Sequence, residues 1–351
     1  MDNFVFKGLP AKVLFGRGRL ADLGDEIAAL ELSKVVVLTT PEQQALGEQV
    51  AEQVAGVCTG HLATATMHTP VEVTEAALDW CQSRGVDGIV SVGGGSTIGL
   101  GKALALRTDL PQICVPTTYA GSEMTDILGQ TVDGKKSTQR GPKIQPEVAI
   151  YDPDLTDTLP QSLSITSGFN AIAHAVEALY AVDCNPIIEF IAGEGIRKLT
   201  RALPQLEGPK AREARDEALQ GAWFCGVSLG SCAMALHHKL AHVLGGSFNL
   251  PHAESHTALL PFSIAYNEPA LNGQLDHARR VLETDNLAQA IFDLADKLGA
   301  PTSLAAVGMP AEGIEKAAEI AVAQPYPNPR PLSFEGIRAL LDDAYHGRRP
   351  T

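Results

Sequence analysis

The sequence has 351 residues, of which 45% are hydrophobic and 19% are charged. A chain of this length and composition can bury large cores in two domains, which excludes a disordered protein. Its formal net charge of -14 gives it no electrostatic reason to bind nucleic acid or an anionic membrane. An anionic substrate would therefore need lysine, arginine or histidine side chains gathered inside its site.

The cysteines and the N-terminus indicate a cytoplasmic protein. None of the six cysteines forms a Cys-x-x-Cys pair, and four lie in apolar stretches, which favours reduced thiols over disulfides or metal ligands. The first residues lack the basic region and the apolar run of a signal peptide. No apolar run reaches the roughly 18 residues that a membrane helix needs.

Strands and helices alternate in the first half of the chain. Strands are predicted at residues 13–16, 34–40, 88–92, 112–116 and 147–151, and helices at about 20–30, 43–57, 74–84 and 96–106. Such alternation predicts right-handed crossovers and a parallel sheet with helices on both faces. The pattern ends at residues 152–155, which resemble a linker, and only helical periodicity follows from about residue 163. The expected organisation is an α/β domain over residues 1–160 and an all-helical domain over residues 161–351.

A glycine-rich turn follows the predicted strand at 88–92. Gly94, Gly95 and Ser96 stand where that strand ends and the next helix begins. Glycines let the backbone approach a ligand, and a helix start offers unpaired N–H groups to a pyrophosphate. The spacing differs from the common G-x-G-x-x-G fingerprint, and a simple tight turn is the structural alternative. We favour dinucleotide binding.

Hydroxyl side chains follow two neighbouring strands at the same expected edge of the sheet. Thr117, Thr118 and Ser122 follow the strand at 112–116, and Thr39 ends the strand at 34–40. Ligands of open α/β sheets bind at the carboxyl ends of the strands. Sites that prefer NAD usually place an acid near Thr39, so a threonine there predicts that both NADH and NADPH are accepted.

Histidines are concentrated in the second half of the chain. Asn170 and His174 are four residues apart and would share one helix face, as would His238 and His242. Five of the ten histidines lie between residues 237 and 256. Gly245-Gly246 and Pro251 are expected to break the helix, so that His252 folds back towards it. Any one of these side chains alone could be a core or surface imidazole, but the cluster favours a functional site.

Five ordered motifs across nearly the whole chain resemble the iron-type alcohol dehydrogenase family: GGGST, PTTYAGSE, GFNAIAHAVEA, HHKLAHVLGGSFNLPHAESH and NPRP. The resemblance implies an architecture shared with dehydroquinate synthase, NAD(P) on the first domain, and an active site between the domains. It also implies that Lys136 contacts the cofactor and that His242 lies near the nicotinamide. The family's divalent metal is usually held by one Asp and three His, which correspond here to Asn170, His174, His238 and His252.

Two departures from the family pattern are informative. Asn170 replaces the carboxylate ligand, and an amide is a weaker ligand for a hard divalent cation. Gly99 replaces an Asp that the family usually has in the glycine-rich helix. Both resemble the maleylacetate reductase branch, which uses NAD(P)H to reduce the carbon–carbon double bond of maleylacetate to 3-oxoadipate in aromatic degradation. We therefore expect a vestigial metal site and an activity that needs no metal.

The resemblance suggests a mechanism. Hydride addition to an alkene conjugated with a ketone makes an enolate, a weaker base than the alkoxide for which carbonyl reduction uses a metal. We expect His242 and His252, with His174 or His238, to stabilise the enolate oxygen, and one imidazole or its water to protonate carbon. Asn170, Arg140, Lys143 and Arg330 are candidates for binding the dicarboxylate. For Arg140 and Lys143 a solvated basic loop is an equal alternative, as is a structural role for Arg330.

Three other functions fit parts of the pattern. A metal-dependent alcohol or polyol dehydrogenase of the same family would lose activity with a chelator. A lyase similar to dehydroquinate synthase would bind NAD without net consumption. A non-catalytic NAD-binding module would leave the crowded imidazoles unused, which burial makes costly. The resemblance also suggests a homodimer whose only other partner is a small anionic dicarboxylate.

Overall fold

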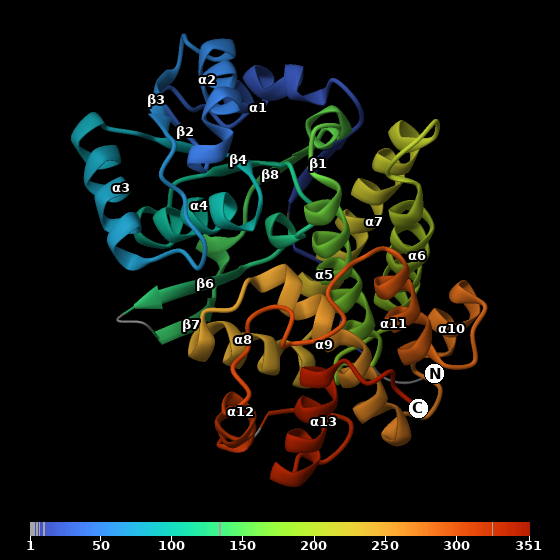
Figure 1. The fold of residues 1–351 in the computed structure, drawn as a ribbon. Coiled ribbons are helices and arrows are strands. Elements are labelled where there is room, and N and C mark those ends of the chain that lie inside the picture. The colour runs from blue at the N-terminus through green and yellow to red at the C-terminus, as the bar shows by residue number, and fades with distance from the viewer. Residues whose placement is uncertain (1–3, 5, 7, 10, 133–134, 325) are drawn as a thin grey trace. The chain divides into compact units, whose positions relative to one another are not determined.

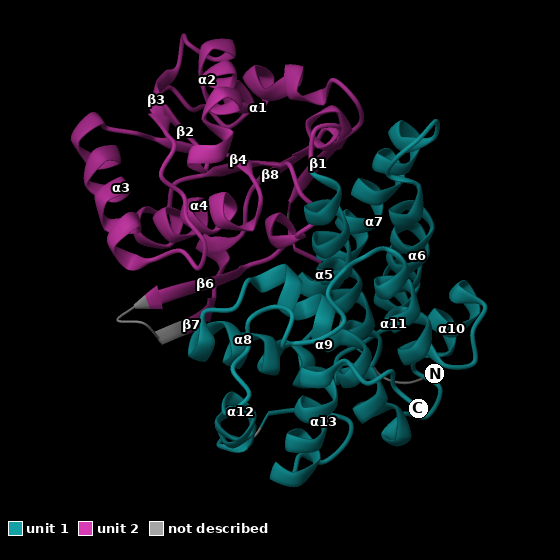
Figure 2. Cartoon of the chain, in the orientation of Figure 1, with its two compact units in different colours: residues 1–7, 160–351 teal, residues 8–159 magenta. Residues whose placement is uncertain are grey.

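The computed structural model describes residues 4, 6, 8–9, 11–132, 135–324 and 326–351 (Figure 1). The chain divides into two compact units, coloured separately in Figure 2. The α/β unit consists of Gly8–Leu159, and the helical unit consists of Met1–Lys7 and Pro160–Thr351. Shortly before the change of unit, the predicted linker forms a 3₁₀ turn at Pro153–Thr156, which Asp152 caps by accepting a bond from the Asp154 amide.

Six parallel strands form the sheet of the α/β unit, in the order β1-β8-β5-β4-β2-β3. They are β1 (Lys12–Phe15), β2 (Val35–Leu38), β3 (Cys58–Leu62), β4 (Gly88–Gly93), β5 (Gln112–Pro116) and β8 (Val148–Tyr151). The five predicted strands and the parallel sheet are confirmed. Strand β3 was not predicted, because Gly60 interrupts it and all its residues are only half-buried.

Helices cover both faces of this sheet. Successive side chains of a strand point to opposite faces, so a strand that is apolar throughout must be covered on both. They are α1 (Leu23–Ala29), α2 (Gln44–Gln53), α3 (Val71–Arg84) and α4 (Gly95–Thr108). Val35 and Val37 pack in one buried cluster with Leu23 of α1 and Val50 of α2. Val36 and Leu38 pack in another with residues of α3 and α4. Each fully buried side chain of this kind contributes roughly 1.5–3 kcal/mol.

Most of the basic segment at residues 134–143, for which a solvated loop was one alternative, belongs to an antiparallel hairpin. Strand β6 (Ile127–Val132) pairs with β7 (Lys135–Arg140), with Ile127 opposite Arg140 and Thr131 opposite Lys136. The backbone of Lys136 therefore belongs to a strand. Its side chain lies outside the part of the chain that the structure describes.

The helical unit contains helices and no strand among its described residues, which confirms the prediction for this half of the chain. The helices are α5 (Gln161–Leu179), α6 (Pro186–Ala202), α7 (Ala211–Ser231), α8 (Leu236–Phe248), α9 (His252–Asn267), α10 (Asp276–Leu282), α11 (Leu287–Lys297), α12 (Gly313–Val322) and α13 (Phe334–His346).

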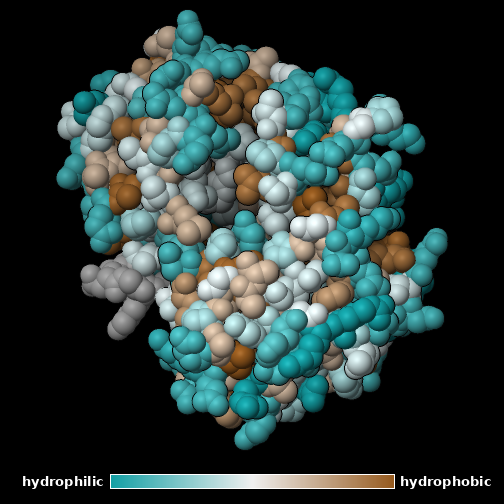
Figure 3. Space-filling model, in the orientation of Figure 1, coloured by the Kyte–Doolittle hydropathy of each residue, from teal (hydrophilic) through white to brown (hydrophobic). Residues whose placement is uncertain are grey.

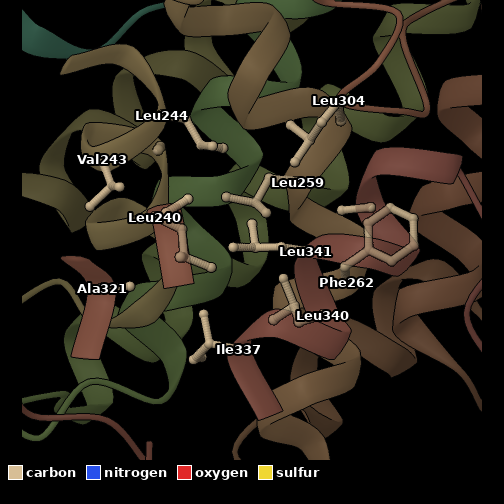
Figure 4. Close-up of a cluster of buried hydrophobic side chains, with 14 of the residues drawn as sticks. Leu240, Val243, Leu244, Leu259, Phe262, Leu304, Ala321, Ile337, Leu340 and Leu341 are labelled. Atoms are coloured by element: carbon tan, nitrogen blue, oxygen red, sulfur yellow. The ribbon is translucent and has the colours of Figure 1, made fainter. Parts of the chain in front are cut away.

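A buried apolar cluster holds α8 and α9 in place (Figure 4). Leu240 and Leu244 of α8 pack with Leu259 of α9 and with Ile337 and Leu341 of α13. Close packing of this kind fixes the rotation of each helix about its axis. The histidines on the other faces of α8 and α9 are therefore held at defined positions.

The surface is largely polar on the face that Figure 3 shows, where hydrophobic residues lie scattered among hydrophilic ones. None of the helices in the described residues is, by itself, long and apolar enough to cross a membrane. Helices α7 and α8 pass that test of length and composition only as a pair, bent by 96° at the break between them. All six cysteines are free thiols.

Candidate functional site

The glycine-rich turn joins β4 to α4 at the carboxyl edge of the sheet. A Cβ atom at Gly93 would lie 2.4 Å from the hydroxyl oxygen of Thr97, so only glycine fits there. Gly94 precedes the first residue of α4, and no side chain caps this helix start. Gly94, Gly95 and Ser96 are at least partly exposed. The first amide groups of α4 are thus placed to receive an anion.

Side chains from two neighbouring strands surround this turn. Thr118 lies against Gly94, where an added Cβ would come within 3.0 Å of it. The hydroxyl of Thr117 accepts a hydrogen bond of 2.8 Å from Gln43 Nε2, and the Thr117 amide donates to the carbonyl of Gly93. The structure therefore brings Thr117 and Thr118 to the glycine-rich turn. Gln43, in the 3₁₀ turn Pro41–Gln43 that follows β2, was not predicted.

Thr39 takes a different position from the one its sequence suggested. Its side chain is fully buried, and its hydroxyl lies 2.7 Å from Nε2 of His61. Thr40 and His61 are the partly exposed side chains at this point of the edge. A direct contact of Thr39 with the cofactor stays a prediction, whereas His61 was missed because β3 was missed.

A buried lysine fixes the segment that carries Ser122. The Nζ atom of Lys102, on α4, donates to the carbonyl oxygens of Ser122, Thr125 and Ile127 at 2.5, 2.7 and 3.0 Å, and to the Thr125 hydroxyl at 2.8 Å. Burial lowers the pKa of Lys102 to about 8. The partly exposed Ser122 is thereby tied to the same helix that begins at the glycine-rich turn.

The basic candidates of the hairpin region form exposed ion pairs within the α/β unit. Arg140 pairs with Asp126, with an N–O distance of 3.6 Å, and Lys143 pairs with Asp109 at 3.2 Å. Both cations are about half exposed. Exposed pairs contribute little to stability, so these side chains can exchange partners easily. Their binding of a substrate carboxylate stays a prediction.

In the helical unit, a carboxylate organises two of the predicted histidines. Glu177 lies on α5, three residues after His174, and is fully buried. It accepts hydrogen bonds from the amides of His237 and His238 at 2.7 and 3.2 Å, and it contacts Nδ1 of His238 closely. Burial alone would raise the pKa of Glu177, but His238 and His237 lower it. Glu177 therefore caps the start of α8 as a carboxylate.

The carboxylate fixes one proton of His238. Nδ1 of His238 faces the Glu177 carboxylate and donates a hydrogen bond to it. Nε2 of His238 lies 2.8 Å from Nδ1 of His174, within hydrogen-bonding distance. Glu177, His238 and His174 form a continuous hydrogen-bonded chain. We had not predicted Glu177, although its spacing from His174 in the sequence was a usable signal.

A second histidine chain lies beside the first. His237 bonds to Ser263 through Nδ1, at 2.9 Å, and to Nδ1 of His256 through Nε2, at 2.8 Å. Both imidazoles are fully buried. Burial lowers the pKa of His237 to about 3 and that of His256 well below its usual value, so both rings are neutral. These two histidines support the others and were not predicted individually.

His242 and His252 are the cluster's more accessible members. Both are half-buried, whereas the side chains of His174 and His238 are buried. The expected helix break is confirmed at Pro251, which precedes α9, but it is wrong at Gly245-Gly246, because α8 continues to Phe248. Asn249, whose φ of 51° is left-handed, caps the end of α8. His252 is instead the first residue of α9, with its ring centroid 4.4 Å from that of His256.

The proposed vestigial metal donors do not fit a divalent ion in this arrangement. No group of three or more His, Cys, Asp or Glu side chains in the described chain is placed to hold one. Both ring nitrogens of His238 are engaged, by Glu177 and His174. Asn170 presents a neutral amide whose oxygen is buried with no hydrogen-bond partner among the described residues. Metal-independent turnover itself stays a prediction.

Arg330 lies against Tyr266 within the helical unit. Its Nη1 donates to the carbonyl of Tyr266 at 3.0 Å, and its guanidinium carbon is 4.4 Å from the centre of that ring. The neighbouring Asn328 accepts from the amide of Leu236 at 3.3 Å and so helps to cap α8. These contacts favour the structural alternative for Arg330, and a contact with substrate stays a prediction.

Comparison with known proteins identifies the family. Residues 10–153 match the family model for iron-containing alcohol dehydrogenase, and residues 164–345 match the C-terminal model of the same family. The chain is 51% identical to a maleylacetate reductase of Rhizobium sp. (strain MTP-10005) and covers all of both chains. It is 49% identical, again over the full length of both chains, to a maleylacetate reductase of Burkholderia cepacia.

A solved structure agrees with these sequence matches. A maleylacetate reductase from Agrobacterium tumefaciens, whose crystal structure is known, is 50% identical to this chain in sequence. The two structures superpose with a TM-score of 0.95, and the match covers 100% of both chains. Sequence and fold thus match the same group of enzymes from end to end. The chain belongs to the iron-containing alcohol dehydrogenase family.

Proposed function

We propose that this chain is a nicotinamide-dependent reductase that converts maleylacetate to 3-oxoadipate. The observation that supports this most strongly is the identity of 49–51% to maleylacetate reductases over the whole chain. The hydrogen-bonded chains of histidines in the helical unit give this chemistry a set of buried and partly buried imidazoles. A non-catalytic module would not need this buried imidazole network.

The carboxyl edge of the α/β unit is proposed to bind NADH or NADPH. The start of α4 with Gly94, Gly95 and Ser96 would hold the pyrophosphate through backbone amides. Thr118 and Ser122 are partly exposed beside it and would supply hydroxyls. Bound there, the reduced nicotinamide supplies the hydride that adds to the alkene carbon β to the ketone. The site of Lys136, which the family resemblance implies, is part of this proposal.

The histidines of the helical unit are proposed to manage the negative charge and the proton. After hydride addition the substrate is an enolate, and His242 and His252 would donate hydrogen bonds to its oxygen. A proton from an imidazole, or from water bound to one, then forms the C–H bond at the carbon next to the ketone. The chain of hydrogen bonds from Glu177 holds the rings of His238 and His174 in place. Asn170, Arg140, Lys143 and Arg330 are proposed contacts for the substrate.

The proposal includes a homodimer in the cytoplasm. Six free thiols suit a reducing compartment. The substrate is a small dicarboxylate, and the strongly negative chain has no need of a nucleic-acid or membrane partner.

An absorbance assay of NADH or NADPH oxidation tests this function. We expect the purified protein to consume either coenzyme with maleylacetate, to act poorly on a simple aldehyde, and to keep its rate after dialysis against a chelator. Loss of activity on metal removal, with recovery on adding iron or zinc, would support a metal-dependent alcohol dehydrogenase instead. Binding of NAD without net coenzyme consumption would support a lyase.

A further inference from the structure

The end of strand β2 is where an α/β dinucleotide site distinguishes NAD from NADP. The glycine-rich turn follows β4, and β2 is the strand beside it in the sheet. In such folds the residue at the end of this neighbouring strand contacts the ribose 2′ group of the coenzyme. Here that residue, Thr39, is fully buried, and its hydroxyl contacts Nε2 of the partly exposed His61.

We propose that His61 determines coenzyme specificity by donating a hydrogen bond from Nδ1 to the 2′-phosphate of NADPH, with Thr39 as the residue that positions it. This inference rests on the proposed function, because it needs a nicotinamide dinucleotide at this edge of the sheet. It deepens that function by assigning the 2′ contact to a residue of β3, the edge strand.

The strand register places the two side chains together. His61 is opposite Val37 in the parallel ladder, and Thr39 is two residues beyond Val37, so both side chains lie on the same face. The amide of Thr39 donates to the carbonyl of Leu62 at 3.0 Å, which continues the pairing beyond the end of β2. The contact of 2.7 Å between the Thr39 hydroxyl and Nε2 is therefore built into the sheet.

Helix α2 leaves room for the ring at one position. A Cβ atom at Gly47 would lie 2.1 Å from Nε2 and 2.5 Å from Cε1 of His61. The Nε2 edge of the imidazole is therefore packed inward, against the backbone of α2 and the hydroxyl of Thr39. The partly exposed side chain has no partner for Nδ1 among the described residues.

Burial of Thr39 decides which nitrogen of His61 carries the proton. A fully buried hydroxyl needs an acceptor for its hydrogen, and Nε2 is the partner that the structure gives it. The Thr39 hydroxyl therefore donates, Nε2 accepts, and the proton of the neutral ring is on Nδ1. Burial lowers the pKa of His61, although Glu48 on α2 opposes this, so the neutral ring is the working form.

An N–H donor at this position favours the phosphate over the hydroxyl. A hydrogen bond to a charged acceptor is roughly twice as strong as one between neutral groups. Glu42 acts in the opposite direction, since it is a fully exposed acid just after Thr40, with its pKa lowered by its own backbone amide and the Thr40 hydroxyl. His61 would thus offset an acid that otherwise disfavours NADPH.

The test compares kcat/KM for NADPH and NADH with maleylacetate as substrate. The double variant Thr39→Val with His61→Phe removes both hydrogen-bonding partners and keeps apolar packing, so that no orphaned group remains. We expect it to lower the NADPH-to-NADH ratio about tenfold. His61→Gln keeps an N–H donor and should lower this ratio less. Glu42→Gln should raise the ratio. Glu52→Gln, an exposed change on α2, is the matched control.

Competitive inhibition by adenosine monophosphates tests the contact with the 2′-phosphate directly. If His61 had only a structural role, its replacement would not change the preference for 2′-AMP over 5′-AMP. The double variant should weaken inhibition by 2′-AMP about tenfold and inhibition by 5′-AMP much less. An unchanged coenzyme ratio, or equal weakening of both nucleotides, would overturn the role of His61. A wild-type protein that consumes neither coenzyme with maleylacetate would overturn the proposed function. Binding of 2′-AMP and 5′-AMP, measured by calorimetry, would still test His61 in that case.

Discussion

His242 and His252 differ from the other clustered histidines in being only half-buried. Their side chains are more accessible than those of His174 and His238, so in the proposed mechanism replacing either by alanine should remove a donor to the enolate oxygen. We expect His242→Ala and His252→Ala each to lower kcat about 100-fold or more. His346→Ala, on the exposed end of α13, should keep the wild-type rate. Steady-state rates near wild type in both cluster variants would contradict the mechanism.

Glu177 is the residue on which the order of the cluster depends most. Glu177→Gln would place an amide N–H₂ against N–H donors of His237 and His238. Removing one partner from a buried charged network costs about 3 kcal/mol or more, so we expect the free energy of unfolding to fall by about that amount. Urea denaturation at pH 7 measures it. The exposed Glu207→Gln should change it by less than about 0.5 kcal/mol.

Individual residues of the site could be predicted where local spacing in the sequence indicates which helix face or helix end they occupy. Asn170 and His174 share a face of α5, and Ser96 stands at a helix start, as periodicity and glycine spacing indicated. His61 could not be found, because its role depends on pairing with Thr39 across two strands. Such a contact is set by sheet register, which a single sequence does not show when the strand itself is weakly patterned.

At the scale of elements, α4 is tied to the segment after β5 by one side chain. Lys102→Met would leave the carbonyls of Ser122, Thr125 and Ile127 without their donor inside the α/β unit. Each unpaired buried acceptor costs about 1–3 kcal/mol, so we expect clear destabilisation by urea denaturation. KM for the coenzyme should rise more than kcat falls, because Ser122 would lose its position. The exposed Lys297→Met is the control, and an unchanged KM would contradict this role.

The elements missed from the sequence share a physical cause. Strand β3 lies at the edge of the sheet and is half-buried, so no apolar run marks it. The β6–β7 hairpin carries polar residues throughout β7, although Asp133-Gly134 in the sequence is a recognised hairpin-turn signal. Helix α8 passes through Gly245-Gly246 because apolar packing by Leu240 and Leu244 outweighs the modest helix penalty of glycine.

At the scale of the whole molecule, the two-part organisation followed from hydrophobic periodicity. The runs at β2, β4 and β5 are buried on both faces, which is what a continuous β-branched run predicts. The helical half has amphipathic segments such as α11, whose apolar residues Leu287, Ile291 and Phe292 recur at helical spacing and are buried. Relative placement of distant groups, such as Glu177 with His238, depends on tertiary packing and could not be derived in the same way.

Buried titratable groups predict how the stability of the whole protein responds to alkali. Burial raises the pKa of the Cys81 thiol to about 11 and raises those of Cys114 and Cys225 further, from a usual value of 9.0. The folded state keeps these protons while the unfolded chain releases them, so the thiols' contribution is complete below pH 9 and is lost above it. Above pH 9 each thiol lowers the free energy of unfolding by about 1.4 kcal/mol per pH unit, until its folded pKa is reached.

Lys102 acts with the opposite sign over a window that begins earlier. Its folded pKa of about 8 lies below the usual 10.5, so the unfolded chain binds the extra proton and stability rises between those values. Between pH 8 and 9 the stability gained from Lys102 exceeds the stability lost from the thiols. Above pH 9 the loss from the three thiols is the larger of the two. Urea unfolding under reducing conditions should therefore show greatest stability near pH 9. Cys225→Ala should flatten the decline by about one proton, and stability still rising at pH 10.5 would contradict this balance.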